Sequence, residues 1–182
     1  MIIKNPSKIN LFVGRINRVP GAISPSLTSG ADMGNEASKP HSDDLRKGRV
    51  SLPGHVYHIT TATYQRQPVF SDLLAARLLI GALREAQTRE DATTLAFVVM
   101  PDHLHWLMQL GSRGSLAQVI GAVKAATAHR IGGRIWQDGF HDHALRQEED
   151  MTKIARYIVA NPLRAHLVER LGDYPHWDAV WL

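Results

Sequence analysis

The chain has 182 residues, 44% of them hydrophobic, and a formal net charge of +4. This length and hydrophobic content suit one folded domain. The lack of cysteine excludes disulfides and thiolate metal sites. No run of about 18 apolar residues indicates a membrane span, and residues 1–15 do not resemble a secretion signal. We therefore expect a soluble, cytoplasmic protein without a membrane partner.

Charge and composition divide the chain in two. Residues 1–41 are rich in Ser, Pro, Gly and Asn, so we expect a disordered extension, or else translation from Met33, followed by one domain at 42–182. Residues 1–50 carry eight Lys/Arg and four Asp/Glu, whereas residues 51–182 carry thirteen of each. Residues 103–137 contain four cations and no acid, a local excess that suits a phosphate backbone.

The first half of the domain predicts a strand, a helix and a second strand. "VYHITTAT" (56–63) is β-branched and aromatic, which indicates a strand, and "TTLAFVVM" (93–100) indicates another. Between them, Ser71 can cap a helix that runs to about Arg89. The predicted inward stripe of this helix is formed by Leu74, Leu78, Ala82 and Ala86, flanked by Leu79 and Leu83.

The second half continues with "HLHWLMQL" (103–110), a strand antiparallel to the second after the turn "PD". A helix begins at Ser115 and ends at Gly132-Gly133, and the residues expected to face inward are Leu116, Val119, Ile120, Val123 and Thr127. A fourth strand is expected near 139–146 and a last helix at 148–167, opened by the acids "EED". This order predicts an α+β fold: a ferredoxin-like antiparallel sheet of four to five strands with helices mainly on one face.

Two histidines one residue apart, His103 and His105, lie inside the apolar third strand. Side chains at i and i+2 project from the same face of a strand, so both imidazoles can converge on one ion while Leu104 points into the core. "HDH" (141–143) has the same spacing, but Asp142 would face the core. "HIT" (58–60) resembles the His-x-Thr of two-histidine phosphoesterases, yet a second such motif is missing. Both are weaker candidates than the first pair.

The last helix carries a polar row beside its apolar stripe. Met151, Ile154, Ala155 and Ile158 follow helical core spacing. Lys153, Tyr157 and Asn161 succeed each other at i, i+4 and i+8 along the flank, where they can meet one ligand. Pro162 places Asn161 at a break in the helix, which makes an N-cap its alternative role. A tyrosine is a weak nucleophile unless a metal polarises the phosphate that it attacks.

In order and spacing, several segments resemble the REP-associated tyrosine transposases, single-tyrosine transposases of the HUH class. The resemblance runs from about Leu45 to Leu171. The segments are "LRKGRVSLPGHVYHITTAT", "QRQPVF", "FVVMPDHLHWLMQL", "WQDGFHDHALR" and "ARYIVANPLRAHLV". The resemblance implies that His103, His105 and Asn161 bind Mg²⁺ or Mn²⁺ and that Tyr157 is the nucleophile. It also implies cleavage and rejoining of single-stranded DNA beside hairpins of repetitive extragenic palindromes, through a 5′-phosphotyrosine. Residues 1–41 depart from the family pattern.

The excess of positive charge in residues 103–137 and the resemblance together indicate which residues contact DNA. We expect phosphate contacts from Arg113, Lys124, Arg130, Arg134 and Lys153, and from Arg46, Lys47 and Arg49 in the segment that resembles the family's base-reading arm. Solvated surface charge is the alternative for each of them. Trp106 and Trp136 can stack on bases, although we favour core packing.

The sequence leaves the assembly and one competing function open. The resemblance to the REP-associated transposases implies a monomer acting in cis, with a dimer as the alternative, and we expect it to be nucleoid-associated. The competing function is a non-catalytic protein that binds hairpin DNA or RNA on the same fold, although the RNP1 pattern of RNA-binding sheets is missing. Replication initiators and relaxases share the histidine pair and the tyrosine, but they usually carry larger accessory domains.

Overall fold

The computed structural model describes residues 51–146 and 150–181. The strands are β1 (Val56–Ala62), β2 (Ala92–Met100), β3 (His103–Leu110), β4 (His141–Ala144) and β5 (Trp177–Ala179). The α-helices are α1 (Leu73–Thr88), α2 (Leu116–Ile131), α3 (Met151–Val159) and α4 (Asn161–Arg164), and 3-10 turns cover Tyr64–Arg66, Val69–Ser71 and Leu171–Asp173. The disorder expected for residues 1–41 and the acids Glu148 and Glu149 lie outside the described residues.

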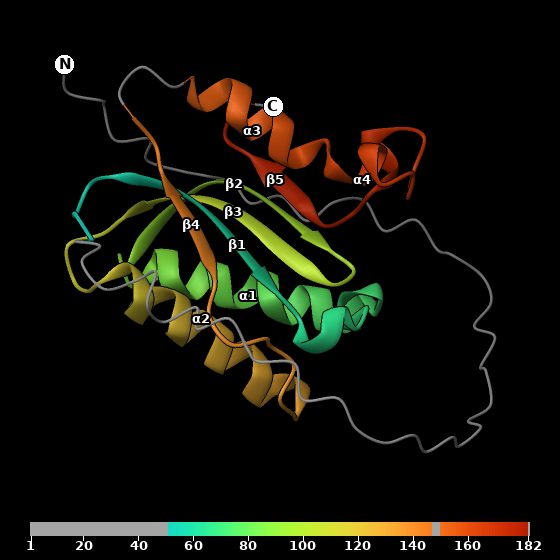
Figure 1. Ribbon diagram of the computed structural model, residues 1–182, viewed down its shortest axis with the longest axis horizontal. Coiled ribbons are helices and arrows are strands. Elements are labelled where there is room, and N and C mark those ends of the chain that lie inside the picture. Colours follow the sequence, from blue (N-terminus) through green and yellow to red (C-terminus); the bar gives the residue numbers. More distant parts are fainter. Residues whose placement is uncertain (1–50, 147–149, 182) are drawn as a thin grey trace, which may run out of the picture.

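One antiparallel sheet organises the domain, with the strand order β4-β1-β3-β2-β5. The two long helices α1 and α2 cover one face, and α3 and α4 lie on the other (Figure 1). The predicted α+β class with an antiparallel sheet is confirmed. The short fifth strand, β5, pairs with the edge of β2 and follows α4 in the chain.

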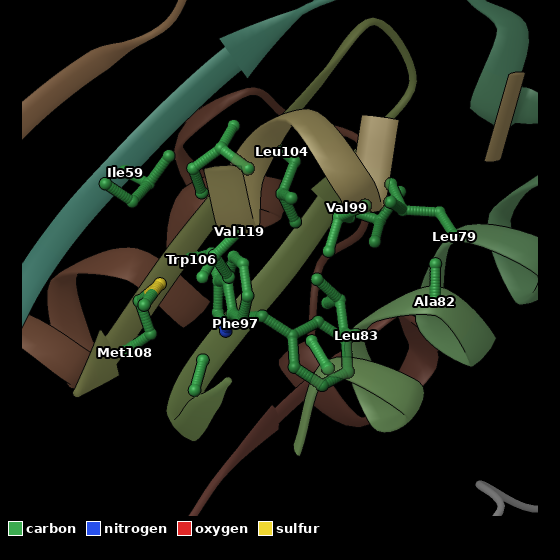
Figure 2. Packing of buried hydrophobic residues seen from close by; sticks show 14 of the residues in the cluster. Ile59, Leu79, Ala82, Leu83, Phe97, Val99, Leu104, Trp106, Met108 and Val119 are labelled. Atoms are coloured by element: carbon green, nitrogen blue, oxygen red, sulfur yellow. The ribbon is translucent and has the colours of Figure 1, made fainter. Parts of the chain in front are cut away.

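Alternation along β3 divides its side chains between two apolar layers. Leu104, Trp106 and Met108 are buried against α1 and α2 (Figure 2). Leu107 is buried in the layer that joins the sheet to α3, together with Ile158. Because neighbouring strand residues point to opposite faces, His103 and His105 share the α3 face with Leu107. The prediction that Leu104 points into the core is confirmed.

The helix α2 forms as its sequence predicts. The Ser115 side chain accepts a hydrogen bond from the Gln118 amide, and the Gln118 side chain accepts one from the Ser115 amide, a complete capping box. Gly132 ends the helix in the left-handed region at φ 93°. The five residues expected to face inward are the buried ones.

The helix α1 departs from the sequence prediction at its start. Its N-cap is Asp72 rather than Ser71, because the Asp72 carboxylate accepts a hydrogen bond from the Ala75 amide at 2.7 Å. Ser71 instead belongs to the preceding 3-10 turn. Leu74 is 66% exposed, and the buried face begins at Ala75 and Ala76. The stripe predicted through Leu74 was therefore wrong at its first position, and its second residue, Leu78, is only partly buried. Across residues 51–146 and 150–181, no helix is long and apolar enough to span a membrane.

Candidate functional site

The histidine pair lies on the central strand of the sheet, on the face that α3 covers. In the β-ladder, His103 is opposite Ala62 and Met100, and His105 is opposite Thr60 and Val98. The two imidazole centroids are 4.8 Å apart, and the rings meet edge to face at 85°. Both side chains are partly buried. The predicted convergence of the two rings on one face is thus what the strand geometry produces.

A carboxylate supports the first histidine. The Nδ1 atom of His103 lies 2.5 Å from Oδ1 of Asp102, and the other carboxylate oxygen accepts a hydrogen bond from the Arg66 guanidinium at 3.3 Å. Burial alone would raise the pKa of Asp102. The hydrogen bond and charge of His103, together with Arg66, outweigh this effect and lower the pKa. Asp102 is therefore an ionised acceptor, which directs the Nδ1 proton of His103 toward itself.

A strained turn after β1 brings Arg66 back to this carboxylate. Gln65 and Arg66 have φ values of 51° and 56°, in the left-handed region that residues with a Cβ rarely occupy. Thr63 secures the turn, because its hydroxyl lies 2.7 Å from the Gln67 carbonyl and 2.9 Å from the Asp102 carbonyl, and its amide donates to the same Asp102 oxygen. The backbone strain is thus maintained beside the histidine pair, as strain often is at functional sites.

Two residues of β1 support the second histidine. The Oγ1 atom of Thr60 and the Nε2 atom of His58 lie 3.0 and 3.2 Å from Nδ1 of His105. Burial, together with the charges of the neighbouring histidines and arginines, lowers the pKa of His105 to about 3. At neutral pH this imidazole is uncharged, the form that can coordinate a metal.

Both histidines therefore use Nδ1 for internal contacts. In each ring the nitrogen that these contacts do not engage is Nε2. The Nε2 atom of His103 has a free lone pair because its Nδ1 donates to the Asp102 carboxylate, and Nε2 of His105 has one in the tautomer whose Nδ1 donates to Thr60 or His58. A histidine that ligates a metal usually has its other nitrogen bound to a carboxylate or another polar group, which fixes its tautomer. Within the described ranges no three His, Asp or Glu side chains form a metal cluster. A metal at the pair would need further oxygen ligands from an amide, water or phosphate.

The candidate nucleophile belongs to α3. Asp150 caps this helix by accepting hydrogen bonds from the amides of Thr152 and Lys153. Ala155 and Ile158 are buried against the sheet, whereas Tyr157 is 53% exposed, as its offset from the core stripe predicts. The Arg164 guanidinium lies 4.3 Å from the centre of the Tyr157 ring. Tyr157 and the two histidines thus occupy the same side of the sheet.

Asn161 lies at the junction of α3 and α4, but its side chain does not cap α4. The Nδ2 group donates to the carbonyls of Tyr157 at 3.2 Å and of Ile158 at 2.8 Å. Ala160 is the N-cap residue of α4, and Pro162 lies in the first turn, as predicted. Because both partners of Nδ2 are carbonyls, the amide orientation is determined and Oδ1 remains an acceptor. The predicted helix over 148–167 is therefore two helices, and the N-cap alternative for Asn161 was wrong.

Of the expected DNA-contacting cations, Lys124 and Arg130 belong to α2 on the opposite face, Arg113 precedes α2, and Arg134 follows it beside Tyr64; each has an internal partner. Arg130 pairs with Glu85 at 2.6 Å, and Arg134 pairs with Asp138 at 3.1 Å. Lys124 donates to two backbone carbonyls at 2.7 Å, and Arg113 donates to one at 3.1 Å. Lys153 is exposed on α3. Arg46, Lys47 and Arg49 lie outside the described residues, and DNA contact by all eight cations stays a prediction.

Comparison with known proteins adds the family to this geometry. The sequence pattern of the family described as "Transposase IS200 like" matches residues 51–161, more than half of the chain. The chain belongs to the IS200-like transposase family. The match begins before β1 and ends at Asn161, so it includes the histidine pair and Tyr157. The resemblance to REP-associated tyrosine transposases that the motifs indicated is confirmed.

Individual relatives match this IS200-like chain at low sequence identity and over only part of their length. It is 31% identical over 83 residues to a REP-associated tyrosine transposase of Escherichia coli, covering 44% of this chain and 50% of the relative. It is 28% identical over 99 residues to a Haemophilus influenzae counterpart, covering 46% and 56%. The chain thus spans about half the length of the curated relatives that it matches. A solved REP-associated tyrosine transposase bound to a REP hairpin shares the fold, with a TM-score of 0.62 at 23% identity over 71% of this chain and 79% of that one.

Sequence reasoning missed the residues that surround the pair in this IS200-like domain. They are His58, Thr60, Arg66, Asp102 and Arg164. By sequence alone, the His-x-Thr of β1 is an incomplete phosphoesterase motif, and "PD" indicates only a turn. The available signal was alternation: β1 and β3 each place polar residues at i and i+2, which lie on one face once the strands pair.

Trp106 and Trp136 are buried, and their indole nitrogens are bonded to Thr94 and to the Lys124 carbonyl, so the predicted core packing is confirmed.

Proposed function

We propose that this chain is a metal-dependent endonuclease and strand transferase that acts on single-stranded DNA beside hairpins, with Tyr157 as the nucleophile. One observation carries the proposal. In a chain of the IS200-like transposase family, two histidines whose Nδ1 atoms are both engaged internally lie on the same side of the sheet as an exposed tyrosine. The solvent exposure of Tyr157 suits a side chain that must meet a macromolecular substrate.

The donor set fits a divalent ion completed by substrate. His103 and His105 would hold it through Nε2, and Asn161 would add Oδ1. A bound Mg²⁺ or Mn²⁺ supplies polarisation of the scissile phosphate and stabilisation of the leaving oxygen. Two imidazoles suit Mn²⁺ better than Mg²⁺, which prefers oxygen ligands, so phosphate oxygens and water have to complete the shell.

Tyr157 would carry out the covalent step. Its hydroxyl oxygen attacks the phosphorus, the bond from phosphorus to the 3′ oxygen breaks, and the tyrosine proton is lost while the 3′ oxygen gains one. The products are a 5′-phosphotyrosine and a free 3′-OH. Because one phosphodiester replaces another, a later 3′-OH can attack the phosphotyrosine and join strands without an external energy source.

The DNA partner is inferred from the relatives. The curated relatives are named for REP elements, and the solved structure with the same fold holds a REP hairpin. We extend this substrate class to the present chain: single-stranded DNA that carries a palindromic hairpin. A protein that works on such DNA acts in the cytoplasm at the nucleoid, and one chain can supply both histidines and the tyrosine, so we propose a monomer.

The test compares the wild type with Tyr157→Phe on labelled single-stranded hairpin DNA from the flanks of its own gene. Each protein is incubated with Mg²⁺, Mn²⁺ or EDTA, and the products are separated on a denaturing gel. A covalent adduct that needs metal and forms only with the wild type is expected. DNA binding without an adduct under any condition would refute the nuclease and favour a non-catalytic hairpin-binding protein. Sedimentation of the free protein as a dimer would refute the monomer.

A further inference from the structure

Arg164 is placed at the candidate nucleophile by the short helix α4. Its guanidinium carbon lies 4.3 Å from the centre of the Tyr157 ring, the distance of a cation–π contact. Arg164 is seven positions after Tyr157 in the sequence, and the break between α3 and α4 at Ala160 lies between them. Figure 1 shows α4 directly after α3, on the side of the sheet opposite α1 and α2.

The charge of Arg164 is not neutralised within the described part of the chain. Arg66, the other arginine close to the pair, is bonded to the Asp102 carboxylate at 3.3 Å. Arg130 on α2 and Arg134 after it also have carboxylate partners. For Arg164, no acid of residues 51–146 or 150–181 lies within ion-pair distance, and its side chain is exposed. An arginine in this state has most of its donors available for an anion.

Arg164 also lies on the same side of the sheet as the histidine pair, because α3 and α4 both lie on the side opposite α1 and α2 (Figure 1). A planar guanidinium stacked on a ring still has N–H donors along its edge, and these match two oxygens of one phosphate.

We propose that Arg164 is a catalytic residue that binds the phosphate attacked by Tyr157 and then holds the resulting phosphotyrosine. The inference rests on the proposed function for its chemical step, but the phosphate contact can be tested without cleavage. The group bound is a DNA phosphodiester in the uncleaved complex and a tyrosine phosphodiester after transfer. Stacking on the ring keeps the guanidinium beside the atom to which the phosphorus becomes bonded.

The binding experiment uses Tyr157→Phe, which keeps the aromatic ring but has no hydroxyl with which to cleave the DNA and form an adduct. Its affinity for the labelled hairpin DNA is measured in EDTA over a range of salt concentrations, alone and combined with Arg164→Gln or Arg156→Gln. Arg156→Gln is the matched control, because it removes the same charge at an exposed position of α3, the helix of Tyr157, about 100° around the axis from the tyrosine. Loss of one phosphate contact on a single strand lowers the slope of log K against log salt by about 0.7.

We expect this smaller slope for Arg164→Gln and an unchanged slope for Arg156→Gln. An unchanged slope for Arg164→Gln, or equal changes for both arginines, would overturn the phosphate contact. In the wild-type background, Arg164→Gln is expected to slow adduct formation about 10²- to 10³-fold, as loss of a transition-state donor does. Arg164→Lys should restore the slope but only part of the rate, because an ammonium lacks the planar pair of donors.

The two proposals fail in different ways. If the wild type forms no adduct with any metal, the proposed nuclease is refuted, and the salt slopes still decide whether Arg164 contacts phosphate. If the wild type forms an adduct and Arg164→Gln forms it at the same rate, the catalytic role of Arg164 is refuted while the nuclease stands. Thermal unfolding of each variant shows whether the fold is retained, which the exposure of both arginines leads us to expect.

Discussion

Replacing Asp102 with asparagine should weaken metal binding at the histidine pair. The carboxylate of Asp102 lies 2.5 Å from Nδ1 of His103 and also accepts from Arg66 at 3.3 Å. An asparagine has one oxygen, so turning it toward His103 places its NH₂ group against the guanidinium. Disturbing a polar partner of a metal-bound histidine typically costs 10- to 100-fold in metal affinity, which is about 1.4–2.7 kcal/mol.

The same change should affect folding much less. The side chain of Arg66 is 58% exposed in its pair with Asp102, and ion pairs of this kind contribute about 1 kcal/mol or less to stability. The free energy of unfolding of Asp102→Asn, measured in urea, should therefore stay within about 1 kcal/mol of the wild type. Because the expected loss in metal-binding free energy exceeds the expected loss in unfolding free energy, comparing the two measurements distinguishes weaker metal binding from a damaged fold.

The assay is a Mn²⁺ titration followed by electron paramagnetic resonance, on the complex of Tyr157→Phe with uncleaved hairpin DNA. Asp138→Asn is the matched control, because its carboxylate also pairs with an arginine, at 3.1 Å, but is not the partner of His103 or His105. We expect weaker Mn²⁺ binding only for Asp102→Asn. Equal affinities of Asp102→Asn and its parent would refute the reasoning, as would an equal loss in the control.

Three further predictions concern stability, each measured by urea unfolding. Trp106→Ala removes a fully buried indole bonded to Thr94 and should lower the free energy of unfolding by about 3–5 kcal/mol. Leu74→Ala, at an exposed leucine, should change it by less than about 0.5 kcal/mol. Similar losses for the two variants would contradict the assigned burial. Ser115→Ala removes the N-cap of α2 and should cost about 1 kcal/mol, so an unchanged midpoint would show that the capping box contributes little. Burial, assisted by the charge of Arg77, lowers the pKa of His176 below its ordinary 6.5. Below pH 6.5 the unfolded chain therefore binds more protons than the folded one. The free energy of unfolding then falls as the pH falls, by at most about 1.4 kcal/mol per pH unit. His176→Gln should remove this part of the fall and gain stability relative to the wild type between pH 7.5 and pH 5; a constant difference between the two would contradict the assignment.

Elements whose signals are local in the chain were predictable. The capping box and the left-handed glycine define α2, and the alternation of apolar and polar residues defines β3. The start of α1 was less predictable, because Ser71 and Asp72 are both good N-cap residues. Asp72 takes the role because Ser71 is part of the preceding 3-10 turn. Leu74 was assigned to the core by periodicity alone, but the sheet meets the helix one residue later, at Ala75.

The sequence by itself determined the ligand pair and the nucleophile as candidates, because strand alternation and helix spacing act over a few residues. Only the tertiary structure decided which groups surround them. His58 and Thr60 reach His105 through strand pairing over more than 40 residues, and Arg66 reaches Asp102 through a strained turn. Arg164 contacts the Tyr157 ring across the break at Ala160, from the short helix α4. Such contacts depend on the register of the sheet and on the packing of α3, which no short segment encodes.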